Sequence, residues 1–223
     1  MNLIERAISL VAPYECLGCH DEGTIICSGC LLSAIPPLPS RCYRCHKATT
    51  QYAVCASCKK YSSLTHVWIT TVYDSLAKEL IYKLKFARAK TAAVPMAALM
   101  SAQLPVLDKN TIITHIPTAN VRVRQRGYDQ SAVIAKELAK INGWLYVPLL
   151  VRIGSSRQVG STKTTRHQQL ADSLIVHNIN FIRGARILLV DDVVTTGATI
   201  ETASQVLKKY KPKQIDVITF AQA

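Results

Sequence analysis

The fold is decided by the stretch ILLVDDVVTTGAT at residues 187–199. An apolar strand ends in Asp191 and Asp192, and a turn rich in hydroxyl groups and glycine then leads into a helical segment. Ligands of open α/β sheets bind at the carboxyl ends of strands, where this pattern places both carboxylates. Adjacent carboxylates can accept hydrogen bonds from vicinal ribose hydroxyls and, through them, help hold Mg²⁺. The turn Thr195–Thr199 offers successive N–H groups at a helix N-terminus, so the stretch predicts a site for a phosphorylated ribose.

Other interpretations of this stretch explain less of it. A buried strand whose aspartates cap the next helix would account for one carboxylate, but not for both together with Thr-Thr-Gly-x-Thr. No Walker lysine follows the turn, and no G-x-G-x-x-G is present. A P-loop or a dinucleotide site is therefore disfavoured.

Outward from this stretch, the rest of the chain after residue 66 alternates strand-like and helical patterns. We expect strands over 67–73, 111–116, 144–151, 186–190 and 214–220, helices over 75–86, 92–104, 130–141 and 198–210, and a polar loop over 154–165. This alternation predicts an α/β domain with a parallel sheet and helices on both faces.

All eight cysteines lie between residues 16 and 58, in C-x-x-C pairs. The pairs are Cys16/Cys19, Cys27/Cys30, Cys42/Cys45 and Cys55/Cys58. Two such pairs complete the tetrahedral thiolate shell that Zn²⁺ prefers, and both a sequential and an interleaved pairing give two Zn(Cys)₄ sites. These shells leave no open coordination position, so the zinc is expected to be structural and a zinc-dependent hydrolase is disfavoured.

Three alternatives for the cysteines are weaker. A disulfide framework needs an oxidising compartment, and the opening residues 1–13 predict a short amphipathic helix rather than an export signal. Covalent haem would use the two C-x-x-C-H matches, before His20 and His46, but would leave two pairs unexplained. A thioredoxin-like redox motif needs a βαβ context that this proline-interrupted region lacks.

The chain carries a formal net charge of +13, which two zinc–thiolate centres would lower to about +9. This balance favours polyanionic partners, including nucleic acid, nucleotides and pyrophosphates. No stretch is long and apolar enough to span a bilayer, so we expect no membrane insertion and a cytoplasmic location.

The stretch 187–199 closely resembles the phosphoribosyl pyrophosphate (PRPP) motif of type I phosphoribosyltransferases. The wider chain resembles the ComF family, competence-associated phosphoribosyltransferase-like proteins with an N-terminal double zinc ribbon. The resemblance rests on the four C-x-x-C pairs, on LIYKLKF at 80–86, on Ile116-Pro117-Thr118 and on RGYDQ at 126–130. Tyr128 and Asp129 depart mildly from the family's usual Arg-Gly-Phe-Asn-Gln. The sequence RHQQLADSL at 166–174 departs more strongly from the family's usual Arg-x-x-Asn-x-x-Gly-Ala-Phe.

The resemblance implies a helix and double zinc-ribbon module over 1–64 and a type I phosphoribosyltransferase-like domain over 65–223. It implies PRPP with Mg²⁺ as ligand, with Asp191 and Asp192 on the ribose hydroxyls and Arg126 on the pyrophosphate. The 5′-phosphate is expected at Thr195, Thr196, Gly197, Ala198 and Thr199, and Val193 and Val194 are expected among the other ligand-binding residues. The remaining contacts expected are Pro117, Thr118 and Ala119 for the pyrophosphate, and Gln158 and Arg166 from a closing loop.

The resemblance also implies a role in DNA uptake or natural transformation, with single-stranded DNA or DNA-uptake proteins as partners. Two alternatives stay open: a metabolic phosphoribosyltransferase that transfers phosphoribose to a nitrogenous base, and a non-catalytic sugar-phosphate sensor. The series Arg122, Arg124 and Arg126, if extended, would place three guanidinium groups on one side of the chain. Such a row could bind either a pyrophosphate or a nucleic-acid backbone.

Overall fold

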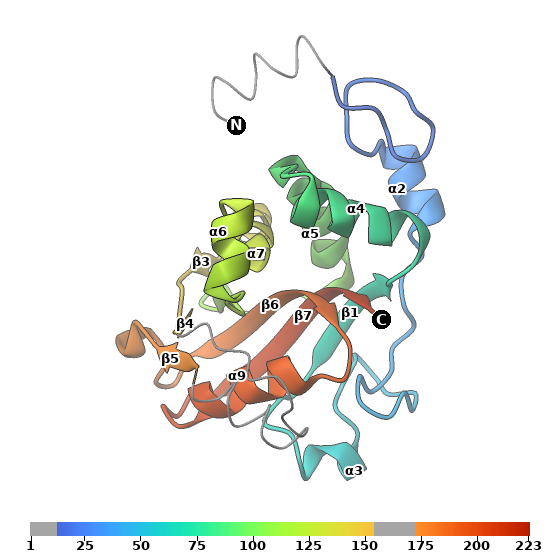
Figure 1. The fold of residues 1–223 in the computed structure, drawn as a ribbon. Helices are drawn as coiled ribbons and strands as arrows, with labels where there is room; N and C mark the ends of the chain where they lie inside the picture. Colours follow the sequence, from blue (N-terminus) through green and yellow to red (C-terminus); the bar gives the residue numbers. More distant parts are fainter. Residues whose placement is uncertain (1–12, 154–172) are drawn as a thin grey trace, which may run out of the picture.

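The computed structural model describes residues 13–153 and 173–223 of the chain. Its centre is a five-stranded sheet in the order β1-β7-β6-β2-β3, in which every neighbouring pair is parallel (Figure 1). The strands are β1 (Val67–Val72), β2 (Ile112–His115), β3 (Leu145–Tyr146), β6 (Arg186–Val194) and β7 (Gln214–Gln222). The two central strands β6 and β7 are buried along most of their length, as parallel strands covered on both faces require.

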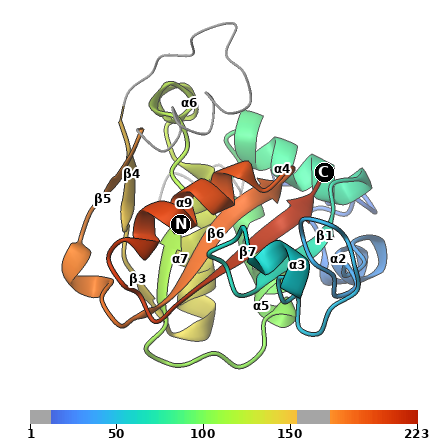
Figure 2. The ribbon, with the colours of Figure 1, turned by 90° about the horizontal axis from the view of Figure 1, so that it is seen from below.

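Helices cover both faces of this sheet (Figures 1 and 2). One face carries α4 (Ser75–Phe86), α5 (Ala93–Gln103) and α7 (Gln130–Asn142), and the other carries α9 (Ala198–Lys208). Successive side chains of β6 point to opposite faces of the sheet. Leu188 packs in the core under α4, α5 and α7, whereas Ile187 and Leu189 pack in the core under α9. The predicted α/β architecture is confirmed.

The two cysteine-rich segments lie on opposite faces of the sheet (Figure 1). The first, with the short helix α2 (Ser28–Ala34), contributes Ile25 and Ile26 to the core around α4. The second, with α3 (Ala56–Lys59), contributes Leu38 and Val54 to the core around α9. Both segments thus share their apolar cores with the sheet, and the division of the chain at residues 64 and 65 stays a prediction.

The prediction of one continuous strand over 144–151 is wrong, because the chain forms two short strands there. The chain forms β3 in the main sheet, leaves it at Val147-Pro148, and then forms β4 (Leu150–Arg152), which pairs antiparallel with β5 (Leu174–Val176). Proline has no N–H to donate to a ladder, which favours an interruption at Pro148. The short 3₁₀ helices η1 (Lys90–Ala92) and η2 (Ile179–Phe181) complete the elements outside the site.

Strand β6 is longer than expected. It continues past Val190 to Val194, so Asp191 and Asp192 lie inside the strand rather than just after it. Within the described ranges, no helix has both the length and the apolar character needed to cross a membrane.

Candidate functional site

Two helices of one sheet face hold the paired aspartates of β6. Asp191 accepts hydrogen bonds from the Ser131 hydroxyl at the start of α7 and from the backbone amide of Asp192, both at 2.9 Å. Asp192 forms an ion pair with Nζ of Lys85 from α4, at 2.5 Å. Ser131 and Lys85 thus hold the two carboxylates near the carboxyl end of β6.

The Asp191 carboxyl ionises less readily than an ordinary aspartate. Burial raises the pKa of Asp191 well above its usual range, and the neighbouring charge of Asp192 raises it further. The hydrogen bond from Ser131 and the charge of Lys85 act in the opposite direction. A ligand that donates hydrogen bonds to Asp191, or a cation placed beside it, would favour its charged form.

The turn after β6 forms a small hollow at the N-terminus of α9. Gly197 precedes the helix with a φ of 79°, a left-handed conformation that glycine adopts without strain. The hollow has a volume of about 30 Å³ and is lined by Asp191, Val193, Val194, Thr195, Gly197, Ala198, Thr199 and Ile200. The amides at the start of a helix and the helix dipole favour an anion at this place.

The loop after β2 approaches the same end of the sheet. The backbone amide of Thr118 donates to the Asp129 carboxylate at 2.7 Å, and the Thr118 hydroxyl donates to its other oxygen at 3.3 Å. Asp129 also caps α7 by accepting from the amides of Ser131 and Ala132. This side chain therefore ties the loop at residues 117–119 to the helix whose Ser131 holds Asp191.

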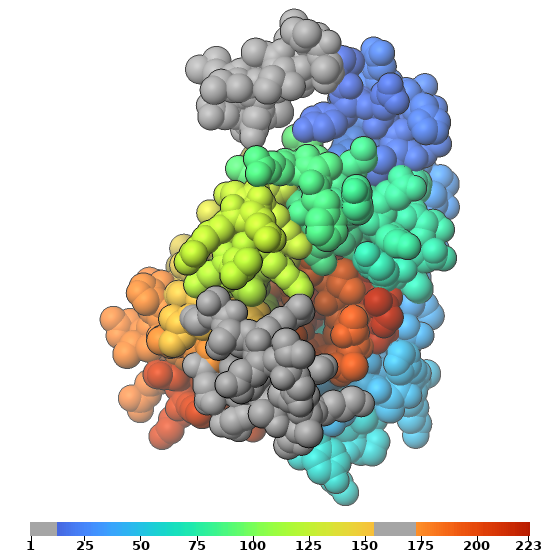
Figure 3. Space-filling view, in the orientation of Figure 1, coloured from blue at the N-terminus to red at the C-terminus, as the bar shows by residue number. Residues whose placement is uncertain are grey.

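A cleft of about 400 Å³ opens beside Asp192, between the end of α4 and helix α6 (Asn120–Arg126). Figure 3 shows the surfaces of α4 and α6 next to each other on this face of the molecule. Four cationic and two aromatic side chains line the cleft with one amide: Lys85, Arg88, Arg122, Arg126, Tyr73, Phe86 and Gln125. The Arg126 guanidinium lies 5.3 Å from the centre of the Phe86 ring, a cation–π contact. The cleft suits an anionic ligand with a flat apolar part.

The expectation of an extended arginine series is wrong, because residues 120–126 form helix α6. Gly127 ends this helix with a φ of 83°, and its amide donates to the carbonyl of Val123. Residues four apart share a helix face, so Arg122 and Arg126 both line the cleft, whereas Arg124 points elsewhere. The row of three guanidinium groups is thus reduced to a pair.

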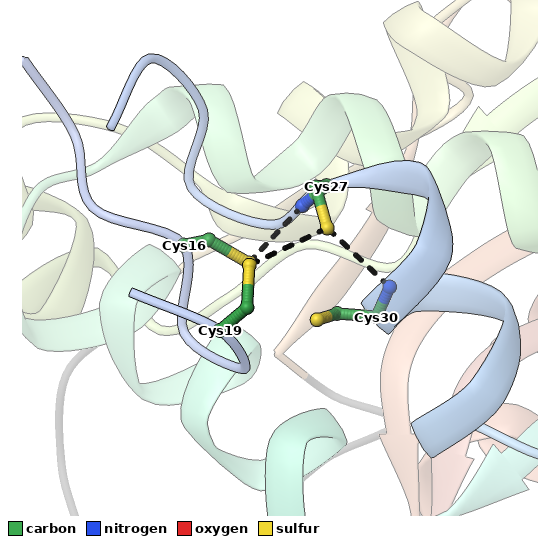
Figure 4. Close-up of side chains that lie close together, drawn as sticks. All are labelled: Cys16, Cys19, Cys27 and Cys30. Carbon is green, nitrogen blue, oxygen red and sulfur yellow. Dashed lines mark hydrogen bonds between the residues drawn. The ribbon is translucent and has the colours of Figure 1, made fainter. Parts of the chain in front are cut away.

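The first four cysteines converge on one point (Figure 4). The sulfur atoms of Cys16, Cys19, Cys27 and Cys30 lie within 4.8 Å of one another. Cys27 caps α2, and its sulfur accepts the amide of Cys30 at 3.4 Å. Backbone amides, first that of Cys19 and then that of Cys27, lower the pKa of the Cys16 thiol to about 6. Four soft thiolates in this arrangement fit a tetrahedral zinc ion.

The second cluster repeats this design with Cys42, Cys45, Cys55 and Cys58, whose sulfur atoms also lie within 4.8 Å of one another. The ligand sets are therefore sequential, and the interleaved pairing left open by the sequence does not form. His20 and His46 each follow a C-x-x-C turn, here called a knuckle, and have left-handed backbones. The His20 amide donates to the carbonyl of Cys16, and the His46 amide donates to that of Cys42. Both histidines close the knuckle turn and belong to neither cluster.

A comparison with protein-family models matches residues 89–223 to the phosphoribosyl transferase domain, which covers more than half of the chain. The chain belongs to this family. The match includes β2, β6 and the turn before α9, so the aspartate pair and the hollow lie inside the phosphoribosyl transferase domain. The two cysteine clusters precede it.

Curated relatives extend the likeness beyond the phosphoribosyl transferase domain. Competence protein F of Haemophilus influenzae is 29% identical over 94% of this chain and 97% of its own length. Competence protein ComFC of Bacillus subtilis is 26% identical over 98% of this chain and 89% of its own length. The DNA utilization protein YhgH of Salmonella typhi is 28% identical over 57% of this chain and 59% of its own length. The resemblance to the ComF family is thereby confirmed.

Among solved structures, the chain is similar to the glutamine PRPP amidotransferase from B. subtilis complexed with ADP and GMP. The likeness has a TM-score of 0.45 and 17% identity, and covers 62% of this chain and 30% of that one.

The phosphoribosyl transferase domain brings together most of the residues predicted for the site. Asp191, Asp192, the turn at 195–199 and Arg126 surround one end of the sheet, while Gln158 and Arg166 lie outside the described residues. Sequence reasoning missed Tyr73, Phe86, Arg88 and Gln125 of the cleft. Phe86 stands in the LIYKLKF segment, whose pattern could have identified it.

Proposed function

We propose that this protein binds PRPP with Mg²⁺ at the end of β6 and acts in DNA uptake or natural transformation. One observation carries the ligand assignment: Asp191 and Asp192 lie near the carboxyl end of β6, and the chain then turns through a left-handed Gly197 into the N-terminus of α9. The carboxylates suit the ribose hydroxyls, and the turn suits the 5′-phosphate. The names of the relatives, two for competence and one for DNA utilization, support the cellular role.

The chemistry of the site fits a hard cation such as Mg²⁺, because the ribose hydroxyls, the pyrophosphate and the nearby carboxylates all offer oxygen atoms. Asp191 and Asp192 would hold it through the ribose hydroxyls, and its charge would offset that of the pyrophosphate. The cleft adds fixed positive charge for the pyrophosphate, from Arg88, Arg122 and Arg126. The loop at 117–119 is proposed to position the pyrophosphate, together with Gln158 and Arg166.

If the domain is catalytic, an acceptor nitrogen forms a bond to the anomeric carbon while the bond from that carbon to a pyrophosphate oxygen breaks. Pyrophosphate leaves with the electron pair, and the proton of the acceptor nitrogen passes to solvent. The protein would contribute by orienting the sugar and stabilising the departing charge rather than by a covalent nucleophile. A phosphoribosyltransferase of metabolism and a sensor without turnover are the alternatives.

Release of pyrophosphate from PRPP across a panel of nitrogenous bases, with and without single-stranded DNA, separates these possibilities. Release with one free base and no need for DNA favours a metabolic transferase. Binding without release favours a sensor. Release that requires DNA supports an enzyme of DNA uptake.

The eight thiolates are proposed to hold two structural zinc ions, one in each cluster. Protein purified without chelator should contain close to two zinc ions per chain by elemental analysis, because each cluster supplies a complete shell. Cys27→Ser should leave about one zinc ion and destabilise the segment around α2 far more than the sheet. Less than one zinc ion in the unmodified protein, or an iron–sulfur chromophore, would rule the assignment out.

A second proposal, binding of single-stranded DNA, is favoured by the surface around the cleft. Tyr82 and Phe86 are 58% and 64% exposed, and their ring centres lie 5.2 Å apart. Arg88, Arg122 and Arg126 line the cleft together with Phe86. Exposed rings interleaved with cations provide stacking for bases and charge for phosphates.

If DNA follows this cleft, Arg122→Ala should weaken binding and reduce the salt slope of the logarithm of affinity by about 0.7, the value for one phosphate of a single strand. Arg124→Ala is the matched control, since it removes the same charge from another face of α6. Fluorescence anisotropy of a labelled oligonucleotide over a salt series measures both. Equal effects of the two variants, or no binding at low salt, would count against the cleft as the DNA site.

A further inference from the structure

The turn at residues 195–199 packs against the second cysteine cluster. Tyr43 lies in the C-x-x-C turn between Cys42 and Cys45, and the residue is only 2% exposed. A Cβ atom added at Gly197 would lie 2.4 Å from Cε2 of Tyr43 and 3.0 Å from Cδ2. The tyrosine ring therefore lies directly against the backbone of the turn and leaves no space for a side chain there.

Polar contacts fix the same tyrosine to the elements on both sides of the turn. Its hydroxyl donates to the buried carboxylate of Glu201, one turn into α9. Its backbone carbonyl accepts from Nε2 of Gln222 at 3.2 Å, and Gln222 also accepts from Arg41 at 2.7 Å. Gln222 is the register partner of Val194, the last residue of β6. The knuckle thus fixes both the strand end before the turn and the helix after it.

The first cluster makes no such contact among the described residues. Its knuckle packs against α4, where a Cβ atom added at Gly18 would lie 3.3 Å from Leu76. Its buried residues belong to the core on the opposite face of the sheet from α9. The two clusters offer the same four thiolates to a metal ion, but only the second contacts the turn at 195–199 among the described residues.

We infer that Tyr43 is a positioning residue for the sugar phosphate, through which the metal shell of Cys42, Cys45, Cys55 and Cys58 sets the shape of the turn at 195–199. The inference rests on the proposed binding of PRPP. A thiolate shell closed around zinc holds the knuckle rigid, and the rigid knuckle presses the ring against Gly197. Amides that are already aimed at the phosphate bind it without the cost of being ordered.

The test compares two tyrosines of the same N-terminal segment by titration calorimetry of the full chain with PRPP and Mg²⁺. Tyr43→Leu should weaken binding by about tenfold or more, because small misplacements of a binding loop have large effects. Tyr52→Leu is the matched control, since Tyr52 is half-buried and bonds to the carbonyl of Leu38, away from the turn. It should lower the melting temperature and leave the affinity unchanged within about twofold.

Two further readouts separate positioning from a general loss of stability. Hydrogen exchange of the amides at 196–200 should accelerate in Tyr43→Leu and not in Tyr52→Leu. Tyr43→Phe keeps the ring against Gly197 and should retain most of the affinity, which keeps the test valid if the leucine variant folds poorly. Cys55→Ser should weaken PRPP binding more than Cys27→Ser.

Wild-type affinity in a folded Tyr43→Leu protein, or equal losses in the two cysteine variants, would overturn this inference and leave the proposed function standing. Absence of PRPP binding in the unmodified protein would instead overturn the proposed function, and the inference with it.

Discussion

Asp191→Asn combined with Asp192→Asn is expected to lower the affinity for PRPP by about 100-fold or more. Each carboxylate is assigned a charged hydrogen bond to a ribose hydroxyl, and such bonds contribute about 1.5–3 kcal/mol each. The thermal shift produced by PRPP and Mg²⁺ in the unmodified protein should disappear in the double variant. A full shift in the double variant would show that the ribose assignment is wrong.

The double variant should still fold. The single variant Asp191→Asn should be more stable than the unmodified protein in the absence of ligand. An asparagine at 191 retains an oxygen that can accept from Ser131 and from the amide of residue 192. Because burial raises the pKa of Asp191, the folded chain binds that proton more tightly than the unfolded chain. Stability is therefore lost as the pH rises above the usual aspartate pKa, and Asp191→Asn removes this loss.

Melting curves of Asp191→Asn without ligand, at about pH 5 and about pH 8, measure this effect. The variant should gain melting temperature relative to the unmodified protein, and the gain should be larger at the higher pH. A difference that shrinks as the pH rises would contradict the assigned direction of the shift.

Gly197→Ala is expected to have the second large effect, with loss of both stability and PRPP binding. The new methyl group would collide with the Tyr43 ring, and the left-handed backbone at this position is unfavourable for alanine. The strained backbone alone costs about 1–2 kcal/mol, and displacement of a buried ring adds about 1–3 kcal/mol. Urea unfolding and calorimetry with PRPP measure the two losses.

Gly143→Ala provides the control for this variant. Gly143 has a similar φ of 68° at the end of α7, but nothing lies within 4 Å of a Cβ atom placed there. It should show the cost of backbone strain alone and bind PRPP normally. If both variants lost the same stability and both bound PRPP, the contact between Tyr43 and Gly197 would have no energetic importance.

Local chemistry made part of this molecule predictable. Strand β6, its aspartates and the turn before α9 follow from a run of apolar residues and from the properties of glycine and threonine in one short stretch. Cysteine spacing likewise predicted two four-thiolate clusters. It could not distinguish the pairing, because both arrangements offer each ion four equivalent ligands.

The parts that could not be predicted depend on contacts between distant segments. Helix α6 was missed because alternating arginines resemble a strand, although Pro117 before it and Gly127 after it are typical helix boundaries. The contact between Tyr43 and Gly197 joins residues far apart in the chain, and no local pattern indicates it. The antiparallel pair β4 and β5 depends on where the chain goes after Pro148.

The central claim is that the end of β6 binds PRPP, and titration calorimetry of the zinc-loaded full chain with PRPP tests it most directly. The account predicts saturable binding of one PRPP per chain that requires Mg²⁺ and is lost in the Asp191→Asn and Asp192→Asn double variant. No binding at PRPP concentrations of about 1 mM with Mg²⁺ present, or unchanged binding by the double variant, would contradict it.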